Sequence, residues 1–341
     1  MSFNIIADAI KANNMELFNL ELNNLNDINL QNTNNDTLLN VAISHNRINN
    51  NRIEMVEILL KRGANPNIKN IKGFNSLHFG IKLMNITILE LLISHGADII
   101  GIINVPIVGD SFLCFAVRKK QIDMIKFLLN HGADPNIQNN DRETPLMIAI
   151  WLFRRKPDIY IIELLLNHGA NPNKQNNIGN TALHHAMRHS KPIMLELLLK
   201  HNGNLNIPNN DNQYPLYTAV RLNNINAVKI LIYHNVKNNN VLKQIINTQN
   251  TNDRYNTHDT VLHHAVRYNN IKITELILIH GGDPNIQNIK GNTPLHLAIS
   301  KCKRKLNDNI NTMINLLLSY GANADIKNKK NKSCSQLLLE I

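Results

Sequence analysis

The chain has 341 residues, of which 43% are hydrophobic, so it holds enough apolar material for a buried core, and its length suggests about two domains. Lysine and arginine number 36 against 25 aspartate and glutamate, and the net charge of +11 favours anionic partners without naming one. Cys114, Cys302 and Cys334 are odd in number and lack Cys-x-x-Cys spacing. This pattern argues against a disulfide framework or zinc motif and fits a reducing compartment.

The N-terminal segment MSFNIIADAIKANN has no basic stretch followed by a continuous apolar run. No segment reaches the roughly 18 apolar residues that a membrane span needs. We therefore expect a cytoplasmic protein without membrane contact, with the nucleus as the alternative location. The basic cluster KCKRK, Lys301 to Lys305, is either a solvated loop or a nuclear localisation patch.

In chain order, residues 1–35 first predict two short helices, in the segments ADAIKANN and MELFNLELNN. From residue 36 onward, a leucine followed three residues later by Ala or Gly recurs. The commonest step between these leucines is 33 residues, which indicates an internal repeat with insertions. The longest insertion falls at about 237–257, where a short helix over 241–246 is expected. The aligned leucines are Leu39, Leu77, Leu113, Leu146, Leu183, Leu216, Leu262 and Leu295.

Each unit continues with a second apolar block that ends in glycine, as in IDMIKFLLNHGADPN. Apolar residues at helical spacing predict two helices per unit, with Thr144 and Thr293 as N-caps. A left-handed glycine is expected to end the second helix, because only glycine adopts that conformation freely. These glycines are Gly96, Gly132, Gly169, Gly281 and Gly321.

The motifs TPLH, at 293–296, and LLLNHGANPN, at 164–173, resemble those of the ankyrin-repeat family. The resemblance implies an all-α solenoid of stacked helix-turn-helix units with hairpin-like loops. It divides the chain into a degenerate N-terminal capping repeat (1–35), eight repeats (36–331) and a truncated C-terminal capping repeat (332–341). The Asn- and Ile-rich turns are similar to those of ankyrin proteins of giant DNA viruses, with AT-rich intracellular bacteria or protists as alternatives.

The adjacent histidine pairs His184–His185 and His263–His264 raise the question of a metal or catalytic site. The first histidine of each pair shares its register with His78 and His296, and other repeats place there Asn40, Cys114, Met147 and Tyr217, which no shared metal site could use. The resemblance implies that this imidazole bridges the turn and the helix start, and the second histidine falls at a packing position. Nucleotide, hydrolase and metalloprotease signatures are absent, so we predict no enzymatic activity, no metal and no cofactor.

Five residues after each aligned leucine, the repeats carry a mostly basic series. This position lies about 140° around the helix from the leucine, and the resemblance implies that it faces a concave groove. Alternatively, arginine serves only solubility there and Trp151 is half buried under the adjacent insertion. The candidate groove residues are Lys82, Arg118, Trp151, Arg188, Arg221 and Arg267, and the candidate loop tips are Asp141, Arg142, Asp211 and Lys290.

These features predict a monomeric, non-catalytic scaffold that binds a partner protein through the groove and loop tips. The basic series favours an acidic partner, and a viral source would make that partner a host-cell protein. The alternative is binding of nucleic acid or another polyanion. It is less favoured because no RNP-type motif and no regular interleaving of aromatic and basic residues is present.

Overall fold

The computed structural model describes residues 2–44, 49–105, 109–152, 159–187, 192–235, 239–250, 257–302 and 308–339. Within these ranges the regular secondary structure is helical, and isolated β-bridges join Gln31 with Thr37 and Lys327 with Ser333. None of the helices there has the length and apolar character needed to cross a bilayer. The chain divides into two compact units, Met1–Asn139 and Asn140–Ile341.

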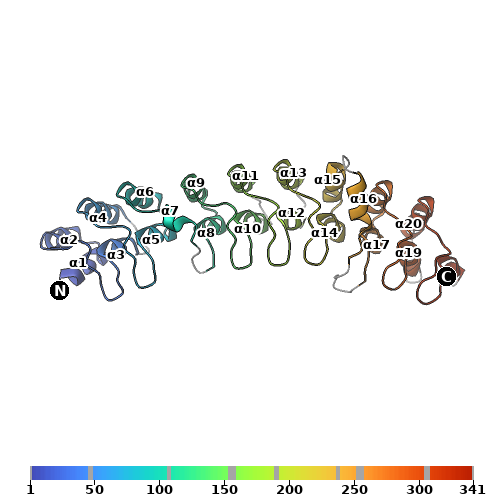
Figure 1. The fold of residues 1–341 in the computed structure, drawn as a ribbon, viewed down its shortest axis with the longest axis horizontal. Helices are drawn as coiled ribbons and strands as arrows, with labels where there is room; N and C mark the ends of the chain where they lie inside the picture. Colours follow the sequence, from blue (N-terminus) through green and yellow to red (C-terminus); the bar gives the residue numbers. More distant parts are fainter. Residues whose placement is uncertain are drawn as a thin grey trace. The chain divides into compact units, whose positions relative to one another are not determined.

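The first unit is a stack of helix pairs (Figure 1). Its helices are α1 (Ser2–Lys11), α2 (Met15–Leu22), α3 (Leu38–Ser44), α4 (Asn50–Lys61), α5 (Ser76–Lys82), α6 (Ile86–Ser94), α7 (Ile100–Ile103), α8 (Phe112–Lys119) and α9 (Ile122–Asn130). Two helices, α1 and α2, occupy the segments in which the sequence predicts a helix pair.

The second unit repeats the arrangement, with the first helix of each pair on the side from which the loops project (Figure 1). Its helices are α10 (Pro145–Leu152), α11 (Ile159–Asn167), α12 (Ala182–Ala186), α13 (Pro192–Lys200), α14 (Pro215–Arg221), α15 (Ile225–Asn235), α16 (Asn239–Asn247), α17 (Val261–Arg267), α18 (Ile271–Ile279), α19 (Pro294–Cys302), α20 (Asp308–Ser319) and α21 (Cys334–Leu339). Helix α16 includes the predicted helix 241–246, and Lys303 to Lys305 of the basic cluster lie outside the described residues.

The aligned leucines form the core between neighbouring helix pairs. All eight are buried, with at most 3% of their surface exposed. The five predicted glycines all have φ between 84° and 90°, in the left-handed region, and end the second helices. The histidines before four of these glycines cap the same helices, because Nδ1 lies within hydrogen-bond distance of the carbonyl four residues earlier, at 2.8 Å for His131, His168 and His280 and at 2.9 Å for His95.

Three histidines of the TPLH register, His184, His263 and His296, each link their repeat to the next. In His184, Nδ1 accepts from the backbone N–H of Thr181 (3.1 Å) and lies 2.9 Å from its hydroxyl, while Nε2 lies 2.9 Å from the carbonyl oxygen of Gln213 in the following loop. His263 and His296 make the same contacts with Asn292 and Lys332. Nδ1 accepts the threonine N–H and so carries no proton, while Nε2 must donate to the carbonyl. These rings are therefore neutral, with the proton on Nε2. The bridging role implied by the family resemblance is confirmed.

Asparagine side chains bracket the loops of successive repeats. The amide of Asn285 donates to the carbonyl of Gly321 (2.9 Å) and its oxygen accepts from the backbone N–H of Asn323 (2.7 Å). Both atoms of one side chain thus fix the next repeat's turn, which gives the abundant asparagines a structural role. The same bracket is formed by Asn67 on Gly96 and Asp98, Asn104 on Gly132 and Asp134, Asn173 on Asn202 and Asn204, and Asn247 on Gly281 and Asp283.

Two inserted helices end at a bracketing asparagine. Gly63 and Gly281 precede their brackets, Asn67 and Asn285, by four residues, whereas Gly96 precedes Asn104 by eight. The additional turn is α7, which ends one residue before Asn104 and buries Ile102 and Ile103. Helix α16 similarly ends on Asn247. The bracket therefore restores the stacking register after each insertion.

Replacing Asn285 with alanine is expected to lower the free energy of unfolding by about 1–2 kcal/mol, because two hydrogen bonds between repeats are lost. The matched control is Asn323→Ala in the same turn, whose side chain accepts the backbone N–H of Asp325 two residues away. It should cost about 0.5 kcal/mol or less. Urea unfolding followed by circular dichroism measures both changes, and equal losses would contradict the bracketing role.

Candidate functional site

The first helix of each pair has an exposed side, and we call this side, together with the loops beside it, the first-helix surface. The helices concerned are α3, α5, α8, α10, α12, α14, α17 and α19. Three of the residues predicted there are exposed: Lys82 at the end of α5, Trp151 in α10 and Arg221 at the end of α14. Trp151 is 45% exposed and therefore half-buried, and the adjacent insertion named in the alternative lies outside the described residues. Arg188 lies outside the described residues.

Two of the predicted groove arginines, Arg118 and Arg267, are held in ion pairs with aspartates of their own repeats. Arg118 Nε lies 2.9 Å from Asp110 Oδ2, and Arg267 pairs with Asp259 in the same register. In both repeats the aspartate precedes the aligned leucine by three residues and the arginine follows it by five. The charge of each arginine is therefore balanced by an aspartate of its own repeat. Lys82 and Arg221 form no ion pair with another described residue, so their positive charges are not balanced in this way.

The Asp259 carboxylate is completely buried, whereas Asp110 is 29% exposed. Its Oδ1 accepts from the amide of Asn288 at 2.8 Å, and its Oδ2 accepts from Arg267. Burial alone would raise the pKa of Asp259, but His263, the Asn288 amide and Arg267 together outweigh burial and hold this pKa below its usual value. This arrangement has the character of a structural ion pair, with no sign of a reacting centre.

The second histidine of each pair is buried, as the sequence predicts. His185 is 7% and His264 6% exposed, and His264 packs edge-on against Tyr217 with ring centroids 4.8 Å apart. In the described residues, no cluster of three or more His, Cys, Asp or Glu side chains is placed to hold a metal ion. Burial raises the pKa of the Cys114 thiol to about 11, so this cysteine is not a ready nucleophile.

The four predicted loop tips are exposed, and two of them, Asp141 and Lys290, join neighbouring loops through their backbone carbonyls. The carbonyl of Asp141 accepts from Asn177 N–H (3.0 Å), and that of Lys290 accepts from Lys329 N–H (3.1 Å). Arg142 adopts the left-handed conformation (φ 56°), and the N–H of Asp211 is held by the Asn209 side chain (3.0 Å). Their side chains are placed at the surface while their backbones are restrained.

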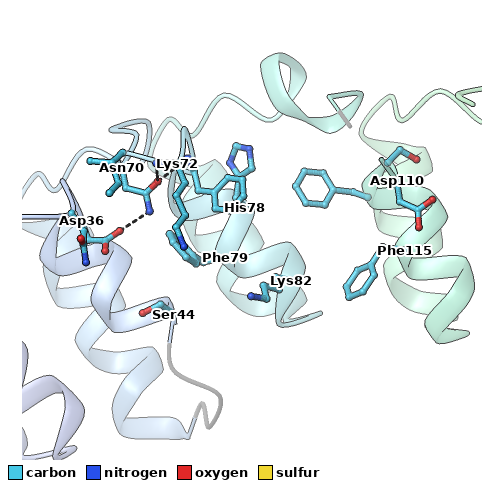
Figure 2. A pocket seen from close by; sticks show the side chains of 14 residues that line it. Asp36, Ser44, Asn70, Lys72, His78, Phe79, Lys82, Asp110 and Phe115 are labelled. Atoms are coloured by element: carbon cyan, nitrogen blue, oxygen red, sulfur yellow. Dashed lines mark hydrogen bonds between the residues drawn. The ribbon is translucent and has the colours of Figure 1, made fainter. Parts of the chain in front are cut away.

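A pocket of about 610 Å³ opens on the first-helix surface of the first unit, in the size range of ligand and side-chain binding sites. Figure 2 shows Phe79 and Lys82 on the α5 side and Phe115 on the α8 side. Helices α5 and α8 flank the pocket, and the inserted helix α7 lies between them in chain order. The lining residues are Asn34, Asp36, Ser44, Asn70, Ile71, Lys72, Phe74, His78, Phe79, Lys82, Asp110, Ser111, Phe112 and Phe115.

Aromatic rings form a continuous chain through this pocket. Phe74 stacks on His78 at 5.2 Å and meets Phe79 edge-on at 6.4 Å, while His78 meets Phe112 edge-on at 5.7 Å. Burial, followed by the charge of Lys69, lowers the pKa of His78 to about 4, so its imidazole is neutral and serves as part of the apolar lining. Phe74, Phe79 and Phe115 remain partly accessible to solvent.

The charged groups around the pocket fall into two classes. Asp36 accepts the amide of Asn70 at 2.8 Å (Figure 2). Asp110 pairs with Arg118, so both carboxylates already have partners. Lys72 and Lys82 are exposed, and neither forms an ion pair with another described residue. Sequence reasoning identified Lys82 but missed the aromatic cluster, although four phenylalanines within two consecutive first-helix motifs were a usable signal.

Comparisons with known proteins agree with this architecture. The family model for ankyrin repeats, which describes three copies, matches residues 6–102, 100–175, 153–241 and 234–330. Among solved structures, the chain is similar to the ankyrin repeat domain of Bcl-3, described as a unique member of the IkappaB protein family, with 26% identity, a TM-score of 0.55, and coverage of 67% of this chain and 94% of that one. No curated protein matches the chain. The stacked helix pairs, the TPLH histidine bridges and the family match together show that this chain belongs to the ankyrin-repeat family.

Proposed function

We propose that this protein is a non-catalytic scaffold that binds a partner protein on its first-helix surface. The observation that carries the proposal is the aromatic pocket between α5 and α8, which lies beside exposed Lys72 and Lys82. Exposed aromatic side chains and cations are the usual anchors of protein interfaces. Trp151 and Arg221 offer the same chemistry in the second unit.

The proposed partner is acidic, because Lys72, Lys82 and Arg221 have no ion-pair partner among the described residues and the chain carries a net charge of +11. The resemblance of the turns to those of giant-virus ankyrin proteins supports a host-cell protein as the partner, and an intracellular monomer is the form proposed to bind it.

Polyanion binding is the second candidate, on the net charge alone. The ion pairs of Arg118 and Arg267 weaken the polyanion candidate, because binding to nucleic-acid phosphates depends on cations that are free to contact them.

Site-specific photocrosslinking tests the surface. A benzoylphenylalanine placed at Lys82 or Arg221 should yield adducts with one partner protein in extract of the native cells, identified by mass spectrometry. The matched controls are Leu20 in α2 and Ile193 in α13, which are 62% and 56% exposed and lie on second helices. Equal adduct yields from these control positions would show that binding does not use the first-helix surface.

A further inference from the structure

We infer that the α5–α8 pocket accepts one large apolar side chain, phenylalanine or leucine, from a partner segment that carries carboxylates on either side of it. This inference rests on the proposed protein-binding function and specifies what one site of it recognises. The occupant follows from the lining of the pocket and from the charges that the fold leaves unpaired.

Phenylalanine rings give the pocket an apolar lining. Phe74, Phe79 and Phe115 are partly accessible, and the buried Phe112 closes the chain of rings through His78. At about 610 Å³ the pocket has room for one bulky side chain with adjacent backbone. An inserted phenylalanine would replace solvent against several rings, and aromatic pairs of this kind add to the free energy of apolar burial.

The charged side chains at the rim of the pocket favour an acidic partner segment. Asp110 is ion-paired with Arg118, and Asp36 accepts a hydrogen bond from the neutral amide of Asn70, so a cationic partner would have to compete with these contacts. Lys72 and Lys82 are exposed at the same rim without an ion-pair partner among the described residues. A partner carboxylate would supply the missing charge, and this favours Glu or Asp next to the apolar anchor.

The probe is a fluorescein-labelled peptide, acetyl-Gly-Glu-Glu-Phe-Glu-Glu-Gly-amide, titrated with the full chain and followed by fluorescence anisotropy. We expect saturable binding that weakens about tenfold when the peptide phenylalanine is replaced by alanine, because the phenyl group is then no longer buried against the rings of the pocket. Phe79→Ala or Phe115→Ala should produce a similar loss. Lys82→Glu, at an exposed position where unfolding is not expected, should weaken binding at least severalfold.

The matched control is Lys229→Glu, which carries the same charge reversal at an exposed position of the second helix α15 and should leave peptide affinity unchanged. The inference is overturned if the peptide does not bind, if Lys229→Glu weakens binding as much as Lys82→Glu, or if a short single-stranded DNA binds with the same dependence on Lys82 and Phe79. Failure of the peptide with retained crosslinking at Arg221 would reject the pocket alone. Failure of both experiments would reject the scaffold proposal.

Discussion

Replacing Asp259 with asparagine is expected to lower the free energy of unfolding by about 2–4 kcal/mol. The buried carboxylate accepts from two donors, Asn288 and Arg267, on different oxygens. An asparagine side chain has the same shape but only one acceptor oxygen, so one of these donors must face an NH₂ group. The substitution also removes the negative charge that balances the partly exposed Arg267.

The matched control is Asp110→Asn, which breaks the corresponding pair in the first unit. Asp110 and Arg118 are 29% and 35% exposed, so water can replace the lost contacts and the cost should be about 1 kcal/mol or less. Urea unfolding of both variants at neutral pH measures the two losses. Equal losses would show that burial of Asp259 does not determine the strength of its pair.

Acidification below about pH 6.5 is expected to destabilise the fold through its buried histidines. Burial, opposed by the Gln213 hydrogen bond, lowers the pKa of His184 to about 4, and burial likewise lowers the pKa values of His263 and His296. The unfolded chain, with an ordinary histidine pKa near 6.5, then binds more protons than the folded chain. The stabilisation is complete above pH 6.5 and is lost as the pH falls from about 6.5 to about 4.

For His184, a shift from 6.5 to about 4 corresponds to about 3 kcal/mol at the acidic end of this window. Denaturant unfolding measured from pH 7.5 to 4.5 should therefore show a falling midpoint. His184→Gln should lower stability at pH 7.5 but flatten the pH dependence, because it removes one titrating group. His234→Gln, at an exposed histidine in α15, should leave the slope nearly unchanged. A His184→Gln slope equal to that of the unaltered chain would contradict the assignment.

The sequence was sufficient for the fold because its signals are local and repeated. The leucine register, the left-handed glycines and the TPLH histidine bridge each depend on a few neighbouring residues, and each is confirmed in the structure. The asparagines were harder to interpret. The bracket formed by Asn285 becomes visible only when the next repeat is placed against it.

The candidate site was less accessible to sequence reasoning, because it depends on how side chains from different turns meet. The sequence prediction took Arg118 and Arg267 as available cations, but each pairs with an aspartate eight residues earlier, directly before the N-cap of the same helix. Those two repeats alone combine an aspartate before the leucine with an arginine after it, so the pairs could have been recognised. The pocket could not be recognised in this way, because its lining comes from four separate segments.

The position of α7 and α16 ahead of their bracketing asparagines has a practical consequence for protein engineering. Foreign sequence can be grafted between the glycine that ends a second helix and the bracketing asparagine that follows it, for example between Pro172 and Asn173. Such a graft should leave the following repeats undisturbed. The natural chain has already accepted a single helical turn and a nine-residue helix at equivalent junctions. These junctions are therefore suitable places to attach reporters or additional recognition elements to a scaffold of this kind.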